Sequence, residues 1–301
     1  MGIYFNPGNE SFTKDKNSEL YLDKTGLLEY LNRVVGTNAN CISVSHARRF
    51  GKSHAAGMID AYYSRGCDSS DLFKDTEIAT KNSYKKYLNQ YNVIHIDVSS
   101  FWDVYKDNII EKIQEYIYDE LEQVYGSQLD YTKMISSALN NFREYTMLKS
   151  KQITRYFGFT EEEVKNLCDI YHMDFESVKA WYNGYLIDGL HMYNPNSVVQ
   201  AMLDHDFDYY WKNTSSFESI NTFITMNYEG LKDDVLAMLA GEKVRVNVNT
   251  FQNDLTTVDS KDDALKALIH LGYLGYETYT SIIKYNDEKS LSCIEEIKSC
   301  D

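Results

Sequence analysis

Cysteine and proline are scarce in this chain of 301 residues, which contains five cysteines and two prolines. The cysteine count is odd and no two cysteines are spaced as Cys-x-x-Cys, so neither a zinc site nor a disulfide framework is predicted. No apolar run approaches the length that spans a membrane, and the first ten residues lack the basic and apolar regions of a signal peptide. We therefore expect a cytoplasmic protein with reduced thiols and no membrane partner.

Basic residues are also in short supply, since 30 lysines and arginines face 45 acidic residues and the net charge is −15. A broad nucleic-acid-binding surface needs clustered lysine and arginine, so nucleic acid is not favoured as a partner. A helix at 261–270 followed by a hairpin would allow a winged-helix reader of DNA, but two aspartates offset its Lys266 and a packing helix is preferred. A small basic patch such as Arg48, Arg49 and Lys52 is compatible with the net charge.

The segment Cys41–Ser53 carries the strongest functional signal in the sequence. Two apolar residues alternate with serines at its start, as in a short strand, and Gly51-Lys52-Ser53 precedes a run of small residues that predicts a helix. A strand, a tight loop, Gly-Lys-Ser and a helix form the context of a phosphate-binding P-loop. In such a loop backbone N–H groups and the helix N-terminus attract phosphate, the lysine reaches the β- and γ-phosphates, and the serine hydroxyl ligates Mg²⁺.

The P-loop pattern is nevertheless incomplete, because His46 stands where the usual pattern begins with glycine. The alternative is an ordinary turn between a strand and a helix, closed by Gly51. From these residues alone, both interpretations stay open.

Residues 45–53, Ser-His-Ala-Arg-Arg-Phe-Gly-Lys-Ser, resemble the Ser-Arg-Pro-Arg-Arg-Phe-Gly-Lys-Ser loop of the AAA-ATPase-like family of bacterial P-loop proteins. Residues 21–25, Tyr-Leu-Asp-Lys-Thr, resemble the Tyr-Val-Asp-Lys-Thr motif that precedes this loop in the family. Further similarities to the family lie at residues 156–164, 181–185, 193–195, 239–242 and 270–276. The resemblance thus extends over nearly the whole chain.

The resemblance implies a protein that binds ATP with Mg²⁺. The phosphate and nucleotide contacts that it implies are Gly51, Lys52, Ser53, Arg48, Arg49 and Phe50, and it assigns Mg²⁺ to Ser53. The leader at 21–25 could lie near the nucleotide in the family, whereas Asp23 could equally be a helix cap and Lys24 a solvated charge. Longer relatives carry a nuclease-like domain of the PD-(D/E)XK type after the ATPase; residues 290–301 lack the sheet and separate aspartate of that core, so we expect a helical end and no nuclease activity.

The main departure from the family is the acidic strand. A hydrolysing P-loop ATPase holds Mg²⁺ through an acidic residue at the end of a second apolar strand, and most orient the attacking water with a neighbouring acid. In this chain neither that strand nor the sensor strand is recognisable, as if a central block were deleted. Asp97, which ends the apolar run 92–96, is the best substitute ligand for Mg²⁺; the alternative is an aspartate that caps the following turn with Ser99 and Ser100.

The fold class that we predict is α/β. Residues 1–150 are expected to form a shortened P-loop NTPase-like core with an incomplete parallel sheet, and residues 151–301 a mostly helical region with a small β hairpin at 273–285. The run 92–98 is nearly all apolar, as in a parallel strand buried on both faces. Helices are predicted at 26–35, 52–63 and 108–126, and after caps at Thr160, Asp174, Ser197 and Ser260.

The function that these observations favour is nucleotide binding with weak or absent hydrolysis, and the catalytic residues stay unassigned. The missing strands would leave sheet edges uncovered, so a protein partner or a homo-oligomer is also considered. The alternative is an interaction module that derives from an ATPase and no longer binds nucleotide.

Overall fold

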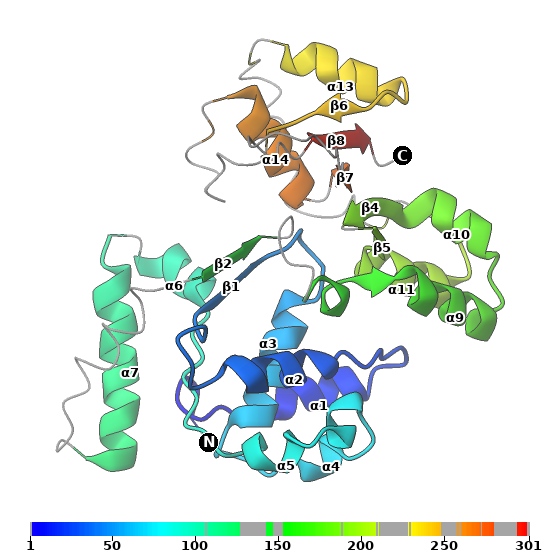
Figure 1. The fold of residues 1–301 in the computed structure, drawn as a ribbon. Coiled ribbons are helices and arrows are strands. Elements are labelled where there is room, and N and C mark those ends of the chain that lie inside the picture. Colours follow the sequence, from blue (N-terminus) through cyan, green and yellow to red (C-terminus); the bar gives the residue numbers. More distant parts are fainter. Residues whose placement is uncertain are drawn as a thin grey trace, which may run out of the picture. The chain divides into compact units, whose positions relative to one another are not determined.

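The protein is described by a computed structural model of a mixed α/β chain (Figure 1). The residues that it describes are 2–105, 107–126, 143–146, 153–187, 189–208, 210, 228, 230–247, 258, 260–271, 273–279 and 294–299. The chain divides into two compact units, each formed by two separate segments. The first unit comprises Met1–Ser43 and Lys52–Glu144, and the second comprises Val44–Gly51 and Tyr145–Asp301.

The first unit is helical over most of its described length. Its elements are α1 (Glu10–Lys16), α2 (Gly26–Val34), α3 (Lys52–Tyr63), α4 (Ser70–Phe73), η1 (Glu77–Thr80), α5 (Tyr84–Tyr87), α6 (Val98–Tyr105) and α7 (Ile109–Tyr125). The helices predicted at 26–35, 52–63 and 108–126 are confirmed, and Gly126 ends the last of them with a φ of +73°. Helix α1 was not predicted, because its only buried residue, Phe12, gives no apolar periodicity.

Aromatic side chains fill the core of the first unit. The Phe12 and Phe73 rings stack at 4.8 Å, and the Tyr62 ring meets Phe73 edge-on at 5.3 Å. Burial raises the pKa of Tyr62 to about 12, and its hydroxyl donates to the Tyr84 carbonyl at 3.0 Å. Phe73 and Ile78 are both fully buried, as anchors of an otherwise polar stretch should be.

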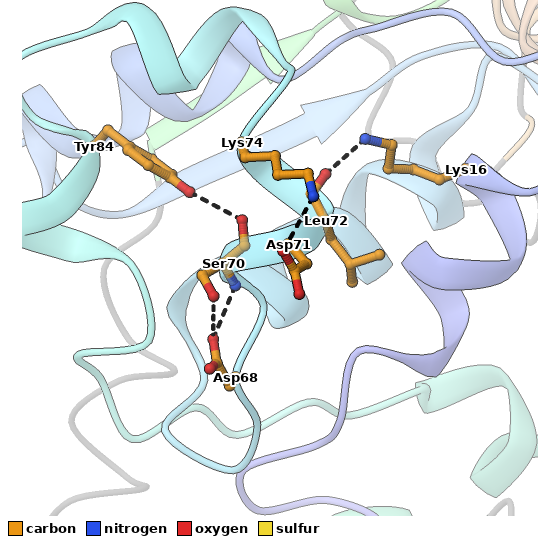
Figure 2. A network of polar contacts seen from close by, with 7 residues as sticks. All are labelled: Lys16, Asp68, Ser70, Asp71, Leu72, Lys74 and Tyr84. Atoms are coloured by element: carbon orange, nitrogen blue, oxygen red, sulfur yellow. Dashed lines mark hydrogen bonds and ion pairs between the residues drawn. The ribbon is translucent and has the colours of Figure 1, made fainter.

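A network of polar contacts fixes the turn that leads into α4 (Figure 2). The Asp68 carboxylate accepts hydrogen bonds from the Ser70 backbone N–H at 2.9 Å and from the Ser70 hydroxyl at 2.7 Å. The Lys16 ammonium donates to the Leu72 carbonyl at 2.7 Å, which ties α1 to α4. These contacts satisfy backbone groups at the ends of a short helix, so they are structural.

The segment at 92–98 departs from its prediction as a buried strand. It forms an isolated antiparallel bridge between Ile94 and Phe5, and the exposed fractions of Ile94 and Val98 are 36% and 53%. Residues 92–97 lie beside the N-terminal residues and form no strand of a sheet, and Val98 already begins α6. The prediction was wrong because an apolar run indicates that its side chains are to be buried, but it does not identify the strands that bury them.

Strand β1 (Ile42–Ser45) pairs with β2 (Arg143–Thr146) in a two-stranded sheet, and the two lie side by side in Figure 1. The division between the units passes through both strands, after Ser43 and after Glu144. Most of the region expected to lack the acidic and sensor strands, residues 127–142, lies outside the described residues.

The second unit is built on a six-stranded sheet of order β3-β5-β4-β7-β8-β6. The strands are β3 (Phe159–Thr160), β4 (Asn183–Ile187), β5 (Leu190–Tyr193), β6 (Val244–Arg245), β7 (Leu274–Tyr279) and β8 (Ile294–Ser299). The β4–β7 pair is parallel and the other neighbours are antiparallel. The prediction of a mostly helical region with one small hairpin needs correction, because it missed strands β3, β4, β5 and β8 and their distant partners.

Helices complete the second unit. They are α9 (Glu161–Tyr171), α10 (Phe175–Tyr182), α11 (Pro195–Asp204), α13 (Leu231–Leu239) and α14 (Lys261–Leu271), with the 3₁₀ turn η2 (Thr154–Tyr156). The predicted caps Thr160, Asp174 and Ser260 are confirmed by side-chain hydrogen bonds to the first turns of their helices. Helix α11 starts at Pro195 under the cap Asn194, two residues before the predicted start at Ser197.

Two further expectations at the C-terminal end need correction. The tail expected to be helical contains β8, which pairs with β7 from Leu274↔Ser299 to Tyr279↔Ile294. The predicted hairpin keeps its first strand as β7, while its second strand at 281–285 lies outside the described residues. Lys266, considered as a DNA contact, is only 2% exposed and pairs with Asp263 at 2.9 Å, so it belongs to the interior of this unit.

Candidate functional site

The strand, loop and helix predicted for Cys41–Ser53 are all present. Strand β1 ends at Ser45 and α3 begins at Lys52, so the loop comprises residues 46–51. Gly51 has a φ of +76°, and a side chain there would meet no atom within 4 Å. The left-handed backbone conformation therefore favours glycine at this position.

The loop, which belongs to the second unit, is buried on both sides of its two arginines. Ala47 and Phe50 are fully buried and His46 is 4% exposed, whereas the Arg48 side chain is exposed and Arg49 is half-buried. The loop is thus fixed by its apolar members while its two arginines lie at or near the surface.

The two arginines differ in backbone and environment. Arg49 has a φ of +68°, a left-handed conformation that is uncommon for a residue with a side chain. Burial lowers the pKa of the Arg49 guanidinium, and nearby Tyr273 opposes this effect. Arg48 donates its backbone N–H to the His270 carbonyl at 2.9 Å, and its side chain is exposed.

Lys52 and Ser53 open helix α3 in the first unit. Lys52 is half-buried, Ser53 is exposed, and the first turn of α3 contains no acidic residue. The next residue, His54, bonds through Nδ1 to an Asp15 carboxylate oxygen at 2.7 Å, which connects α3 to α1. Asp15 was not expected at this position, because α1 was not predicted. A helix N-terminus without its own acid favours an anion at this position.

Asp97 makes the contacts of a helix cap. Its carboxylate accepts from the Ser99 hydroxyl at 2.5 Å and from the Ser99 N–H at 3.0 Å, and the Ser100 hydroxyl donates to the Asp97 carbonyl at 2.7 Å. These hydrogen bonds, that from the Ser99 hydroxyl above all, lower the pKa of Asp97. The capping alternative that the sequence left open describes these contacts at the start of α6.

Residues of the motif at 21–25 also make capping hydrogen bonds. Asp23 accepts from the Thr25 N–H at 2.8 Å and from the Glu77 N–H at 2.6 Å, and the Thr25 hydroxyl accepts from the Ile78 N–H at 3.1 Å. Asp23 and Thr25 therefore hold the first turn of η1 against the start of α2.

Strand β2, which pairs with β1, was not predicted, because the sequence around it has no apolar run to signal a buried strand. Within the ranges that the structure describes, no group of three or more His, Cys, Asp or Glu side chains is arranged to hold a metal ion.

Comparison with known families places these observations in context. The family described as Predicted AAA-ATPase matches residues 8–184, which is more than half of the chain, and the chain belongs to this AAA-ATPase-like family. The matched region includes the motifs at 21–25, 45–53 and 156–164 and extends to the Gly184 of the motif at 181–185. A search of curated proteins gave no match, and a search of solved structures gave none. No helix in the described part of the chain combines the length and apolar character that a membrane span requires.

Proposed function

We propose that the chain binds a nucleoside triphosphate through the loop and helix start at Gly51, Lys52 and Ser53. The observation that carries this proposal is the order β1, loop, α3, with left-handed Gly51 directly before a helix whose first turn lacks acid. Backbone N–H groups of such a turn and the partial positive charge of the helix N-terminus stabilise phosphate oxygens. Family membership gives independent support.

Each residue of the motif has a role that follows from its chemistry. Lys52 would neutralise charge on the β- and γ-phosphates, and Arg48 and Arg49 would add positive potential in an otherwise acidic protein. The Ser53 hydroxyl is exposed and fits one ligand position of Mg²⁺, a hard cation that prefers oxygen. Bound Mg²⁺ would supply charge neutralisation between the phosphates.

We further propose that hydrolysis is slow. Efficient turnover needs an acid that orients water beside the γ-phosphate. Asp97 uses its carboxylate to cap α6, and the sequence between α7 and β2 lacks an apolar strand that ends in acidic residues.

The first experiment is the shift in melting temperature with Mg²⁺-ATP, Mg²⁺-GTP and ADP. A ligand at a hundredfold excess over its dissociation constant stabilises the folded state by about 2.7 kcal/mol, so wild type should melt several degrees higher. Lys52→Ala should lose this shift. Lys85→Ala removes an exposed lysine on α5 and should keep it, as a matched control.

Two outcomes would contradict the proposal. A cooperative melt that no nucleotide shifts would mean a folded chain that does not bind nucleotide, and would favour the interaction module. Rapid phosphate release that disappears in Lys52→Ala would overturn slow hydrolysis while leaving nucleotide binding in place.

A further inference from the structure

Three contacts within the second unit hold the loop at alternate residues. The His46 ring packs against the Phe157 ring at 4.8 Å, and the Arg48 N–H donates to the His270 carbonyl at 2.9 Å. The Phe50 carbonyl accepts from the Gly158 N–H at 3.2 Å. Residues far apart in the sequence thus fix the backbone of the loop before it reaches Gly51.

The Phe50 side chain is the apolar anchor of this arrangement. It is fully buried and meets the Tyr185 ring edge-on at 5.0 Å, within a hydrophobic cluster that includes β4, β5, α14 and β7. The Tyr185 hydroxyl in turn donates to the Ile269 carbonyl at 3.4 Å, one residue before the carbonyl that holds Arg48. The same part of α14 therefore supports two points of the loop.

The absence of a side chain at Gly158 leaves space for the Phe50 ring. Its φ is +89°, and a Cβ at this position would lie 2.7 Å from Cδ1 and 2.8 Å from Cε1 of the Phe50 ring. The Tyr193 carbonyl oxygen would be 3.2 Å away on another side. A side chain at Gly158 would therefore displace either the Phe50 ring or the backbone that donates to the Phe50 carbonyl.

These contacts involve several sequence motifs to which the proposed function assigns no role. Phe157 and Gly158 come from the motif at 156–164, Tyr185 from 181–185, Tyr193 from 193–195, and His270 from 270–276. Phe157, Gly158, Tyr185 and His270 contact residues 46–50, and the Tyr193 carbonyl lies beside Gly158. We infer that the second unit positions the loop for phosphate binding, with Gly158 as the positioning residue that seats Phe50; this inference rests on the proposed function.

The physical reason is preorganisation. A loop that is already held in its bound conformation loses less conformational freedom when phosphate binds, so its affinity is higher. The tethers stop at residue 50, immediately before the Gly51-Lys52-Ser53 triplet. Loosening them should weaken nucleotide binding although none of the supporting residues touches the nucleotide.

The test compares Gly158→Ala with Gly241→Ala. Both glycines belong to the second unit and have almost the same left-handed φ, +89° and +86°, but a Cβ at Gly241 would meet no atom within 4 Å. The pair therefore separates the clash with Phe50 from the backbone strain that both substitutions share. We would measure the affinity for Mg²⁺-ATP by titration and the hydrogen exchange rate of the Arg48 amide, which reports the tether to His270.

We expect Gly158→Ala to weaken Mg²⁺-ATP binding at least tenfold and to speed Arg48 exchange at least tenfold, whereas Gly241→Ala changes each less than twofold. If Gly158→Ala does not fold, Phe50→Leu carries the test, with weaker binding and faster Arg48 exchange expected. If Gly158→Ala folds, adding Phe50→Leu to it should not weaken binding further. Gly158→Ala creates a clash with the Phe50 ring and Phe50→Leu removes that ring, so the effects of the two substitutions should not add.

The failure of this inference is distinguishable from that of the proposed function. If wild type binds no nucleotide, the proposed function fails, and unchanged Arg48 exchange in Gly158→Ala would overturn the tether independently. If wild type binds Mg²⁺-ATP and Gly158→Ala binds it equally well, the inference is overturned whatever the exchange rates show.

Discussion

Residues 42–45 and the segment at 92–98 were both expected to be strands of one parallel sheet. The loop at 46–51, which follows the first of them, differs from the segment at 92–98 in what covers it. In the loop, Ala47 and Phe50 are fully buried by side chains of the second unit. In the other segment, Ile94 and Val98 are 36% and 53% exposed. Apolar side chains are thus well covered in the loop and poorly covered in the other segment.

The contacts of the two regions explain this difference. The loop is held by residues from three later motifs, whereas residues 92–98 pair with the N-terminal residues through backbone hydrogen bonds and with Asp60 through His95. The Asn6 N–H donates to the Val93 carbonyl at 2.7 Å, and the His95 N–H donates to the Tyr4 carbonyl at 2.8 Å. Backbone pairing orders an extended segment, but it does not bury the side chains that face away from the partner.

The largest effect is expected from removing the buried Phe50 ring of the loop. Phe50→Ala should lower the free energy of unfolding of the second unit by about 3–5 kcal/mol, the usual cost of removing a buried phenylalanine from a core. Ile94→Ala should cost about 1 kcal/mol, because more than a third of that side chain is already exposed. Urea unfolding, with peptide-level hydrogen exchange to assign each transition to a unit, measures both.

Equal effects of these two substitutions would contradict the difference in cover. A small effect of Phe50→Ala would show that the loop detaches at little cost, and that the second unit does not depend on it. A large effect of Ile94→Ala would show that the segment at 92–98 is more deeply buried in solution than its contacts indicate.

A smaller effect is expected from the carboxylate that holds the partner of 92–98. Glu120 on α7 accepts from the Tyr4 N–H at 2.9 Å and from the Phe5 N–H at 3.2 Å. Glu120→Gln replaces one charged acceptor by an amide nitrogen that cannot accept, so the first unit should lose about 1–2 kcal/mol of stability. Faster exchange of the Asn6 and His95 amides should accompany the loss.

The control for this prediction is Glu122→Gln, which changes an exposed carboxylate two residues further along α7. Its effect on urea unfolding should be within about 0.5 kcal/mol. If both variants unfold at the same urea concentration as wild type, Glu120 does not order the N-terminal residues.

Local rules explain what the sequence could predict. Helices were located where a cap and an apolar stripe coincide, as at Thr160, Asp174 and the stretch 108–126, because both signals lie within a few residues of each other. Strands β4, β5 and β8 were missed because each is short and its stability depends on a partner elsewhere in the chain. The pattern inside a strand does not identify that partner.

The candidate site likewise has one part that could be predicted from the sequence and one part that could not. The strand, the glycine and the helix start were predictable because the motif is continuous in the sequence. The support of the loop by Gly158 and by the His270 carbonyl was not, because backbone acceptors carry no side-chain signature and the contacts join distant segments. For Asp97, the sequence offered a Mg²⁺ ligand and a cap, and Ser99 and Ser100 make the hydrogen bonds of the cap.

The smallest expected effect concerns the pH dependence of that cap. The folded-state pKa of Asp97 lies below its ordinary value of 3.8, so its ionised form stabilises the fold above that pH and the contribution is lost as the pH falls through the folded-state pKa. Asp97→Asn should flatten this part of the stability profile, by less than about 1 kcal/mol because the group is exposed. Asp119→Asn, an exposed carboxylate on α7, is the control, measured by urea unfolding between pH 2 and pH 6.

The same variant sharpens the role of Asp97 in the proposed site. An asparagine can still cap α6 at neutral pH, because its side-chain oxygen accepts the same hydrogen bonds. We therefore expect Asp97→Asn to leave the Mg²⁺ dependence of ATP binding unchanged near pH 7, where the cap is intact in both proteins. A selective loss of that dependence, with the melting temperature preserved, would instead assign Asp97 to the metal and would show that the exposed segment at 92–98 takes part in nucleotide binding with the buried loop.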